Sequence, residues 1–206
     1  MANESAIELR IVTLVEKNRM NKLLFLLFLL CVLHGASLAF VEDSLTVPAS
    51  HLSLGLTFSE IRNQPGVGLA ITTPYFLNDK VALRFSGNLY FLFNIPLASA
   101  SEQVLPYISP RFGAVYVAGT LAESMRLCLL GGVTYILPGT KISDDKGIGG
   151  YVGFGFEFFT GSLARSRISF LFESSIVVAP VIAEKLPGQP IYASGIDLSA
   201  GIRYYF

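Results

Sequence analysis

The chain has 206 residues, of which 52% are hydrophobic and 15% are charged, and its fifteen basic and fifteen acidic side chains give a formal net charge of zero. This balance excludes the basic surface expected of a nucleic-acid-binding protein. Two cysteines, two histidines and no tryptophan leave little material for a thiolate metal site, a disulfide framework or a histidine-rich active centre, so we expect no cofactor. The mean hydropathy of +0.56 is high for a soluble domain.

An apolar run near the N-terminus has the parts of a secretory signal peptide. Met20-Asn21-Lys22 gives a basic start, residues 23–33 are apolar, and the small residues Ser37 and Ala39 follow. These two would lie three and one residues before the cleavage point, where small side chains fit the peptidase. Acidic and basic residues are mixed before this run, which favours Met20 as the initiator. The predicted regions are a leader and signal peptide over 1–39, a short periplasmic segment over 40–50 and a β-barrel over 51–206.

Two other interpretations of this run fit the sequence less well. A single-span anchor would use Leu23–Phe40, which only marginally reaches the roughly 20 residues needed to cross a bilayer, and His34 and Ser37 make that span poor. A lipid-modified Cys31 would be preceded by small residues, but two leucines precede it here. The signal peptide is therefore the preferred interpretation.

Beyond this run no stretch has a helical period, but eight segments alternate apolar residues with small or polar ones at a period of two. In the first, Leu52, Leu54, Leu56 and Phe58 oppose small and hydroxylated residues. The segments are residues 52–59, 67–72, 81–93, 104–118, 125–135, 151–158, 167–178 and 195–206. The fourth is the least regular, because its prolines cannot donate to a β-ladder.

This alternation fits a soluble barrel with its apolar face inward or a membrane barrel with its apolar face outward. The polar face is mostly Gly, Ala, Ser and Thr, whereas a soluble exterior would be rich in Lys and Glu. Segments of roughly 9 to 11 residues can cross a bilayer at a tilt of about 45°. We therefore predict an all-β, eight-stranded antiparallel up-and-down transmembrane β-barrel, with a lipocalin-like soluble barrel as the alternative.

Aromatic residues and loop lengths support the membrane barrel. The apolar face carries aromatic residues near strand ends, which would form two girdles: Tyr75, Tyr116, Phe158 and Tyr204 at one end, and Phe93, Tyr135 and Tyr192 at the other. Tight turns at 77–80, 119–123 and 161–165 alternate with longer loops at 94–103, 137–150 and 180–191. With both termini in the periplasm, the longer loops would meet the outside, where an extracellular ligand is not identified by the sequence.

The last residues resemble the assembly signal of bacterial outer-membrane barrel proteins. That signal places apolar side chains at alternating positions and ends in an aromatic residue, as do Leu198, Ala200, Ile202, Tyr204 and Phe206. With the signal peptide and eight strands, residues 50–206 resemble the class of small outer-membrane barrels typified by OmpX, the OmpA barrel and OmpW. The resemblance implies a place in the cell outer membrane, contact with its lipids and recognition by the barrel-assembly machinery. The absence of tryptophan departs from the usual OmpW-like pattern.

An eight-stranded barrel has an interior just wide enough to be filled by side chains, which excludes a wide porin channel. The alternation places a set of charged residues in this interior: Arg84, Arg111, Arg126, Arg167 and Arg203 with Glu157, Glu173 and Asp197. Enclosed charges must pair or stay hydrated. Hairpin pairing predicts Glu157 close to Arg126 and Arg167, Arg203 beside Arg167, and Asp197 beside Glu173.

The primary interpretation of this interior is a polar plug in a barrel with a structural or surface-interaction role. An anion-selective constriction, or an OmpW-like conduit for slender and apolar solutes, is the alternative. The small inward residues, such as Gly155 and Gly201, would either leave a narrow cavity or make room for long arginine side chains.

An outer-membrane lipid-modifying enzyme is a minor alternative, and we expect no catalysis. His51-Leu52-Ser53 resembles the His-x-Ser of lipid A deacylases, but it lies at the periplasmic end of its strand, far from an outer-leaflet substrate. Residues 147–150 are glycine-rich but precede a strand, so they lack the helix that a phosphate loop needs. Asp144 and Asp145 suggest at most weak calcium binding, since Lys141 and Lys146 favour a solvated loop, and we predict no metal site.

Overall fold

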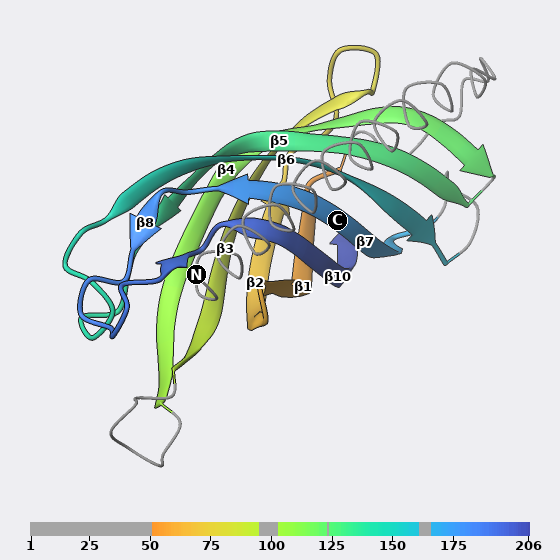
Figure 1. The fold of residues 1–206 in the computed structure, drawn as a ribbon. Coiled ribbons are helices and arrows are strands. Elements are labelled where there is room, and N and C mark those ends of the chain that lie inside the picture. Colours follow the sequence, from red (N-terminus) through yellow and green to blue (C-terminus); the bar gives the residue numbers. More distant parts are fainter. Residues whose placement is uncertain (1–50, 95–102, 123, 161–165) are drawn as a thin grey trace, which may run out of the picture. The chain divides into compact units, whose positions relative to one another are not determined.

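The computed structural model describes residues 51–94, 103–122, 124–160 and 166–206. Eight antiparallel strands close into one barrel, in which β1 pairs with β10 (Figure 1). These strands are β1 Ser53–Ile61, β2 Gln64–Thr72, β3 Val81–Asn94, β4 Gln103–Ala122, β5 Met125–Ile136, β6 Gly147–Phe159, β7 Ile168–Val178 and β10 Gly195–Tyr205. The predicted fold class is confirmed.

The signal peptide with Ser37 and Ala39, and the segment 40–50, lie outside the described residues. Among the residues that are described, no helix is long and apolar enough to cross a membrane.

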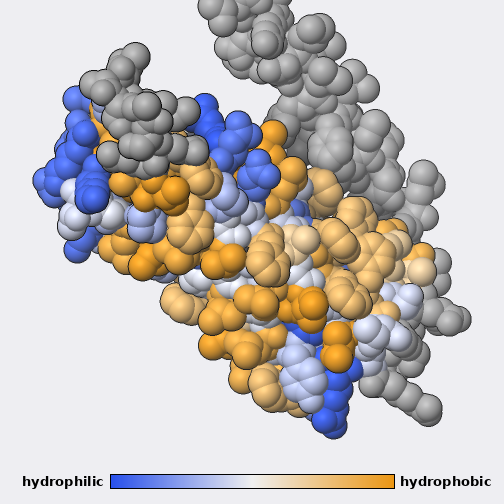
Figure 2. Space-filling model, turned by 90° about the horizontal axis from the view of Figure 1, so that it is seen from below, coloured by the Kyte–Doolittle hydropathy of each residue, from blue (hydrophilic) through white to orange (hydrophobic). Residues whose placement is uncertain are grey.

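The alternation of the sequence separates the two faces of the barrel wall. Successive side chains of a strand point to opposite faces, and in β2 every second residue from Gln64 to Thr72 is buried while the residues between are exposed. The outward set is apolar, with Phe58 61% and Leu69 58% exposed. Figure 2 shows hydrophobic residues covering much of one face. The barrel is therefore polar inside and apolar outside.

The hairpins reflect local turn chemistry. β1 and β2 are joined by Arg62 and Asn63, whose φ angles of 50° and 62° are those of the type I′ turn that matches the twist of a two-residue hairpin. At the opposite end, Leu77, Asn78 and Asp79 also have positive φ angles, in the turn between β2 and β3. We call the end with the turns 73–80 and 122–125 the turn end, and the other the loop end.

The irregular fourth segment forms one long strand, because its prolines lie where they remove few hydrogen bonds from the β-ladder. Pro106 and Pro110 face outward, and both pair with β3. On the β5 side, Ile108 bridges to Leu137, and regular pairing resumes at Arg111. The ladder to β5 is thus interrupted where Pro110 has no N–H to donate.

The loop at 180–191 contains structure that the sequence analysis did not predict. It holds the two-stranded hairpin of β8, Val181–Ile182, and β9, Ile191–Tyr192. Side chains from this segment and from residues 137–146 pack in an apolar cluster with inward residues of β1, β3, β4, β5 and β7. We call these two loop segments with the cluster the cap.

The predicted girdle assignment is wrong for two residues. Tyr75 and Tyr192 are only 6% and 1% exposed and belong to buried clusters, because both lie outside the barrel strands, where the alternation does not fix the direction of a side chain. The other predicted girdle residues are exposed: Tyr116, Phe158, Tyr204, Phe93 and Tyr135.

Candidate functional site in the barrel lumen

A charged cluster fills the lumen at the turn end, and Glu157 of β6 is its centre. Arg126 Nε of β5 donates to Glu157 Oε2 at 2.7 Å, and Arg203 Nη1 of β10 lies 3.2 Å from Oε1. Ser169 Oγ and the Tyr205 hydroxyl also donate to Oε1, at 2.5 and 2.6 Å. One fully buried carboxylate therefore compensates two guanidinium groups. We call Glu157, Arg126, Arg203, Ser169, Tyr205 and Tyr75 the turn-end cluster.

Aromatic rings complete the enclosure of Arg126. Its guanidinium carbon lies 4.7 Å from the ring centroid of Tyr75 and 5.1 Å from that of Phe159, within the range of cation–π attraction. Its Nη2 donates to the hydroxyls of Tyr75 and Tyr205 at 2.9 and 2.6 Å. Burial raises the pKa of Tyr75, so its phenol stays neutral and accepts this bond. Among the described residues, it is side chains that close the lumen here.

Two further ion pairs cross the middle of the lumen. Arg84 Nη1 of β3 lies 2.7 Å from Glu173 Oε1 of β7. Arg111 Nη1 of β4 lies 2.5 Å from Asp197 Oδ2 of β10, and Arg111 also donates to the Tyr90 hydroxyl at 2.9 Å. Both pairs join strands on opposite sides of the barrel, so they tie its walls together across the interior.

A small cavity of about 40 Å³ lies between these two pairs. Arg84 Nε, Arg111 Nε and Asp197 Oδ1 belong to side chains on its wall and have no hydrogen-bond partner among the described residues. A water molecule needs roughly 10 to 15 Å³ of such space and two to four polar partners. The cavity thus suits a few waters but not an organic solute.

The loop end is closed by apolar packing. Ile136 of β5, Ile142 of the first cap loop and Ala183 of the second are completely buried. The ring of Tyr107 stacks on that of Tyr90 at 5.4 Å and meets that of Tyr192 edge-on at 5.2 Å. This packing resembles the core of a small soluble domain placed in the mouth of the barrel.

Backbone and surface bonds hold the two cap loops together. Lys185 N donates to Ile142 O at 3.1 Å, and Lys185 Nζ donates to Thr140 O at 2.8 Å and lies 2.5 Å from Asp144 Oδ1. Ser194 Oγ accepts from Ala179 N at 2.8 Å at the base of the second loop. The cap is therefore an ordered element with its own bonds.

The predicted lumen charges lie inside the barrel with one exception. Arg84, Arg111, Arg126, Arg203, Glu157, Glu173 and Asp197 all face the lumen. Arg167 is exposed, so the prediction that it lies beside Glu157 and Arg203 is wrong. β7 begins only at Ile168, and the chain bends at Arg167, so the strand alternation does not extend to this side chain.

The two acids predicted to lie beside each other, Asp197 and Glu173, are diagonal neighbours on β10 and β7. Asp197 stands opposite Ser175, and Glu173 stands opposite Ser199. Each carboxylate is held by its own arginine from the far side of the barrel, so like charges are not left facing each other.

Three functional hydroxyls were missed by the sequence analysis. Tyr90 and Tyr205 occupy inward positions of their strands, so the alternation could have identified them. Tyr75 follows β2 and turns back over the lumen mouth, and no local pattern predicts that. These tyrosines hydrogen-bond to the buried arginines at both levels of the lumen.

The small inward residues make room for long side chains. A Cβ built on Gly155 would lie 2.6 Å from Glu173 Cγ, so a larger residue would displace the partner of Arg84. A Cβ built on Gly201 would meet Leu56 O at 2.5 Å. These positions are thus occupied by their neighbours and do not form a passage.

The other residues considered for catalysis or metal binding do not form a site. His51 is exposed, whereas Ser53 Oγ is buried and has no hydrogen-bond partner among the described residues. Cys128 is a buried free thiol. Within residues 51–94, 103–122, 124–160 and 166–206, no cluster of three or more His, Cys, Asp or Glu side chains is arranged to hold a metal ion.

Comparison with known proteins bears on the fold. No protein-family model matches the chain, and no curated protein matches it. The chain is similar to the crystal structure of the N-terminal β-barrel domain of Pseudomonas aeruginosa OprF, with a TM-score of 0.50 and 14% identity over 76% of this chain and 98% of that domain. It shares the fold of this barrel domain. At this identity the likeness concerns the fold alone, and the predicted resemblance to small outer-membrane barrels is confirmed at that level.

Two other solved structures are similar to a smaller degree. One is the outer membrane protein Ail of Yersinia pestis in a phospholipid bilayer nanodisc, with a TM-score of 0.43 and 14% identity over 76% of this chain and 99% of that one. The other is the outer membrane protein OprG of Pseudomonas aeruginosa, with a TM-score of 0.44 and 12% identity over 80% of this chain and 99% of that one.

Proposed function

We propose that the chain is an integral outer-membrane barrel protein with a closed lumen and a structural or surface-interaction role. A continuous apolar wall around a charged interior supports the membrane location, because in a soluble barrel the two faces would be exchanged. The barrel fold supports it as well. In this proposal the assembly machinery recognises β10 together with Phe206, which follows it, and outer-membrane lipids surround the wall.

The observation that carries the proposal is the closure of the lumen at both ends. Arg126 and Glu157 are 0% exposed at the turn end, and Ile136 and Ile142 are 0% exposed at the loop end. A solute would have to separate a buried ion-pair cluster and an apolar core in turn. A barrel built in this way acts through its surfaces and not through its interior.

The cap is the surface that we assign to interaction. In small outer-membrane barrels the long connections face outside and the short turns face the periplasm, so in this proposal the cap lies on the cell surface. Ile182 and Ile191 of its hairpin are 46% and 55% exposed, and Asp144 of the other cap loop is exposed as well. Because the cap has its own core, it would present these side chains in a fixed arrangement.

Conductance in planar bilayers, combined with uptake of a fluorescent apolar probe into proteoliposomes, tests this proposal. We expect neither current nor uptake from the refolded barrel. Steady currents or uptake that rises with protein concentration would reject the closed lumen and favour the conduit. A variant with residues 180–191 replaced by a short turn removes one closure only and should also be silent. Currents from that variant would show that the turn-end cluster does not seal.

A further inference from the structure

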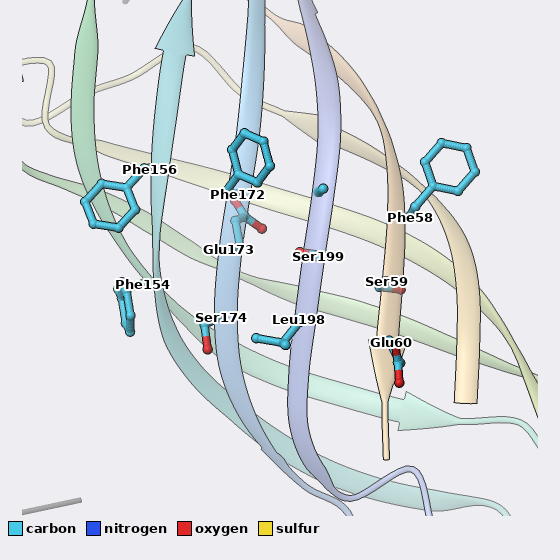
Figure 3. A pocket seen from close by; sticks show the side chains of 11 residues that line it. Phe58, Ser59, Glu60, Phe154, Phe156, Phe172, Glu173, Ser174, Leu198 and Ser199 are labelled. Atoms are coloured by element: carbon cyan, nitrogen blue, oxygen red, sulfur yellow. The ribbon is translucent and has the colours of Figure 1, made fainter. Parts of the chain in front are cut away.

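Two hollows in the described part of the chain differ in chemistry. The larger, of about 530 Å³, is an apolar groove on the outer wall beside Phe58, Phe156 and Phe172 (Figure 3). In the membrane location proposed above, acyl chains of any surrounding lipid would fill it. The smaller is the lumen cavity of about 40 Å³ between the Arg84 and Arg111 ion pairs, and polar side chains form most of its wall. A small space with polar walls selects its occupant, so this cavity is the better candidate for a binding site.

The two arginines on the wall of this cavity have unused donors. Arg84 meets both carboxylate oxygens of Glu173 through Nη1, at 2.7 and 3.0 Å, which leaves Nε and Nη2 without a partner among the described residues. Arg111 uses Nη1 and Nη2 for Asp197 and Tyr90, and its Nε is left in the same way. Both arginine side chains are only 9% exposed. Three buried guanidinium nitrogens therefore need an acceptor.

Other polar groups of the cavity wall can donate as well. They are hydroxyl and amide side chains of β1, β3, β7 and β10: Thr57, Ser59, Ser86, Asn88, Ser175 and Ser199. On the same wall, Asp197 Oδ1 is a carboxylate oxygen without a partner among the described residues. A water molecule brings two hydrogens that need acceptors of their own, whereas an anion only accepts. The surplus of donors at this cavity therefore favours an anion.

The charge of the lumen favours an anion too. Among the described residues, four arginines face the interior against three carboxylates, which leaves one positive charge in excess: Arg84, Arg111, Arg126 and Arg203 against Glu157, Glu173 and Asp197. An enclosed charge without a counter-charge is costly. Size limits the choice, because a space for a few waters admits a monatomic anion but not a sulfate or phosphate with five heavy atoms.

We propose that the cavity binds one monovalent inorganic anion of the size of chloride, held by the free N–H groups of Arg84 and Arg111. The anion would enter as the barrel folds and would remain as a fixed counter-ion of the closed lumen. Charge-assisted bonds from guanidinium groups to an anion are stronger than bonds between neutral groups, so the ion would strengthen the contact between the strands that carry the two arginines and the walls facing them. The inference concerns the lumen alone and does not depend on a surface role for the cap.

The dependence of stability on chloride tests this site. The refolded barrel is unfolded with urea in a non-ionic detergent at constant ionic strength, while sodium chloride replaces sodium gluconate, whose anion is too large for the cavity. We expect the folding equilibrium constant to rise about tenfold for each tenfold rise in chloride above its dissociation constant, as one bound ion requires. Bromide should act like chloride, and sulfate should not. The same folding equilibrium constant in chloride and in gluconate would overturn the proposal.

Matched variants separate this site from general effects of salt. Arg84→Lys keeps a cation for Glu173 but removes Nε and Nη2, so it should abolish the chloride dependence. Arg62→Lys makes the same change at an exposed arginine and should keep the dependence. Asp197→Asn removes the carboxylate that opposes an anion, so chloride should bind about tenfold more tightly or better. A dependence that persists in Arg84→Lys, or weakens in Asp197→Asn, would contradict the assignment.

Bromide also locates the ion directly, because its anomalous scattering distinguishes it from water. Crystals of the barrel refolded in sodium bromide should show one anomalous peak in the cavity, within hydrogen-bond distance of Arg84 and Arg111. This measurement needs no substitution, so it decides the question even where a variant does not refold. Density in the cavity without an anomalous peak would assign the space to water and reject the anion.

Discussion

The two ends of the lumen are closed by opposite chemistry. At the turn end, side chains of the strands and of one turn meet around Glu157, and every contact involves a charge or a hydroxyl. At the loop end, loops contribute Ile142, Val181 and Tyr192 to an apolar core. The difference follows from the amount of chain available. Tight turns leave little backbone to fold over the opening, so long arginine and tyrosine side chains reach across it, whereas longer loops can gather a core of their own.

This contrast predicts different failure modes. The turn-end cluster belongs to the strands, so damage there should destabilise the whole barrel. The cap is joined to the barrel through its loops and core, so damage there should open it locally while the strands remain paired.

The largest effect is expected from Glu157→Gln. The substitution leaves two buried guanidinium groups without their carboxylate, and breaking such a pair costs about 3 to 5 kcal/mol. Thermal or urea unfolding of the refolded barrel in detergent measures it. Glu173→Gln is the matched control, since Glu173 compensates only Arg84 and is 12% exposed. Equal losses for the two variants would show that the turn-end cluster is not the tighter of the two sites.

A smaller and local effect is expected from Ile142→Ala in the cap. Removal of a fully buried aliphatic side chain costs about 2 to 4 kcal/mol of the packing around it. Hydrogen exchange should accelerate at the amides of the two cap loops and stay unchanged in the barrel strands. Ile182→Ala, at a 46% exposed position of the same cap, should leave hydrogen exchange unchanged in both the cap loops and the strands. Faster exchange throughout the strands would show that the cap and barrel unfold as one unit.

Deletion of Phe206 tests what the last residue, at the turn end, contributes to folding and to delivery. The folded chain loses the bond from Phe206 N to Leu52 O at 3.0 Å and a ring contact with Tyr204 at 5.2 Å, which amounts to about 1 to 2 kcal/mol. We expect the shortened chain to refold in detergent yet to accumulate poorly in the outer membrane of cells, because the resemblance to the assembly signal assigns the terminal aromatic to delivery. Normal accumulation in cells, or equal failure in detergent, would contradict this role.

The smallest effect is expected from Tyr192→Phe. Burial raises the pKa of Tyr192 to about 12, from about 10 for a free phenol. The open cap therefore loses this proton before the closed cap does, and the closed cap loses stability as pH rises from about 10 to 12. The hydroxyl has no partner among the described residues, so Tyr192→Phe should keep or slightly raise stability near neutral pH and weaken the alkaline opening. Unchanged opening in the variant would assign it to other tyrosines.

Which face of each strand points inward follows from the sequence alone. Alternation is a local property with a period of two, so Arg126 and Glu157 could be placed inside, and Phe58 and Leu69 outside, without knowledge of any partner. Where the strand stopped, this reasoning stopped as well. Arg167 lies one residue before β7 and Tyr75 lies after β2, and both were assigned to the wrong environment.

Which charges meet depends on the tertiary structure. Arg84 and Glu173 are 89 residues apart in the chain, and Arg111 and Asp197 are 86 apart. Their contacts cross the lumen, so they depend on how far the strands are staggered when the barrel closes, and hairpin register does not contain that information. The cap core has the same origin. It combines residues from distant segments, whose positions are fixed only once β1 pairs with β10.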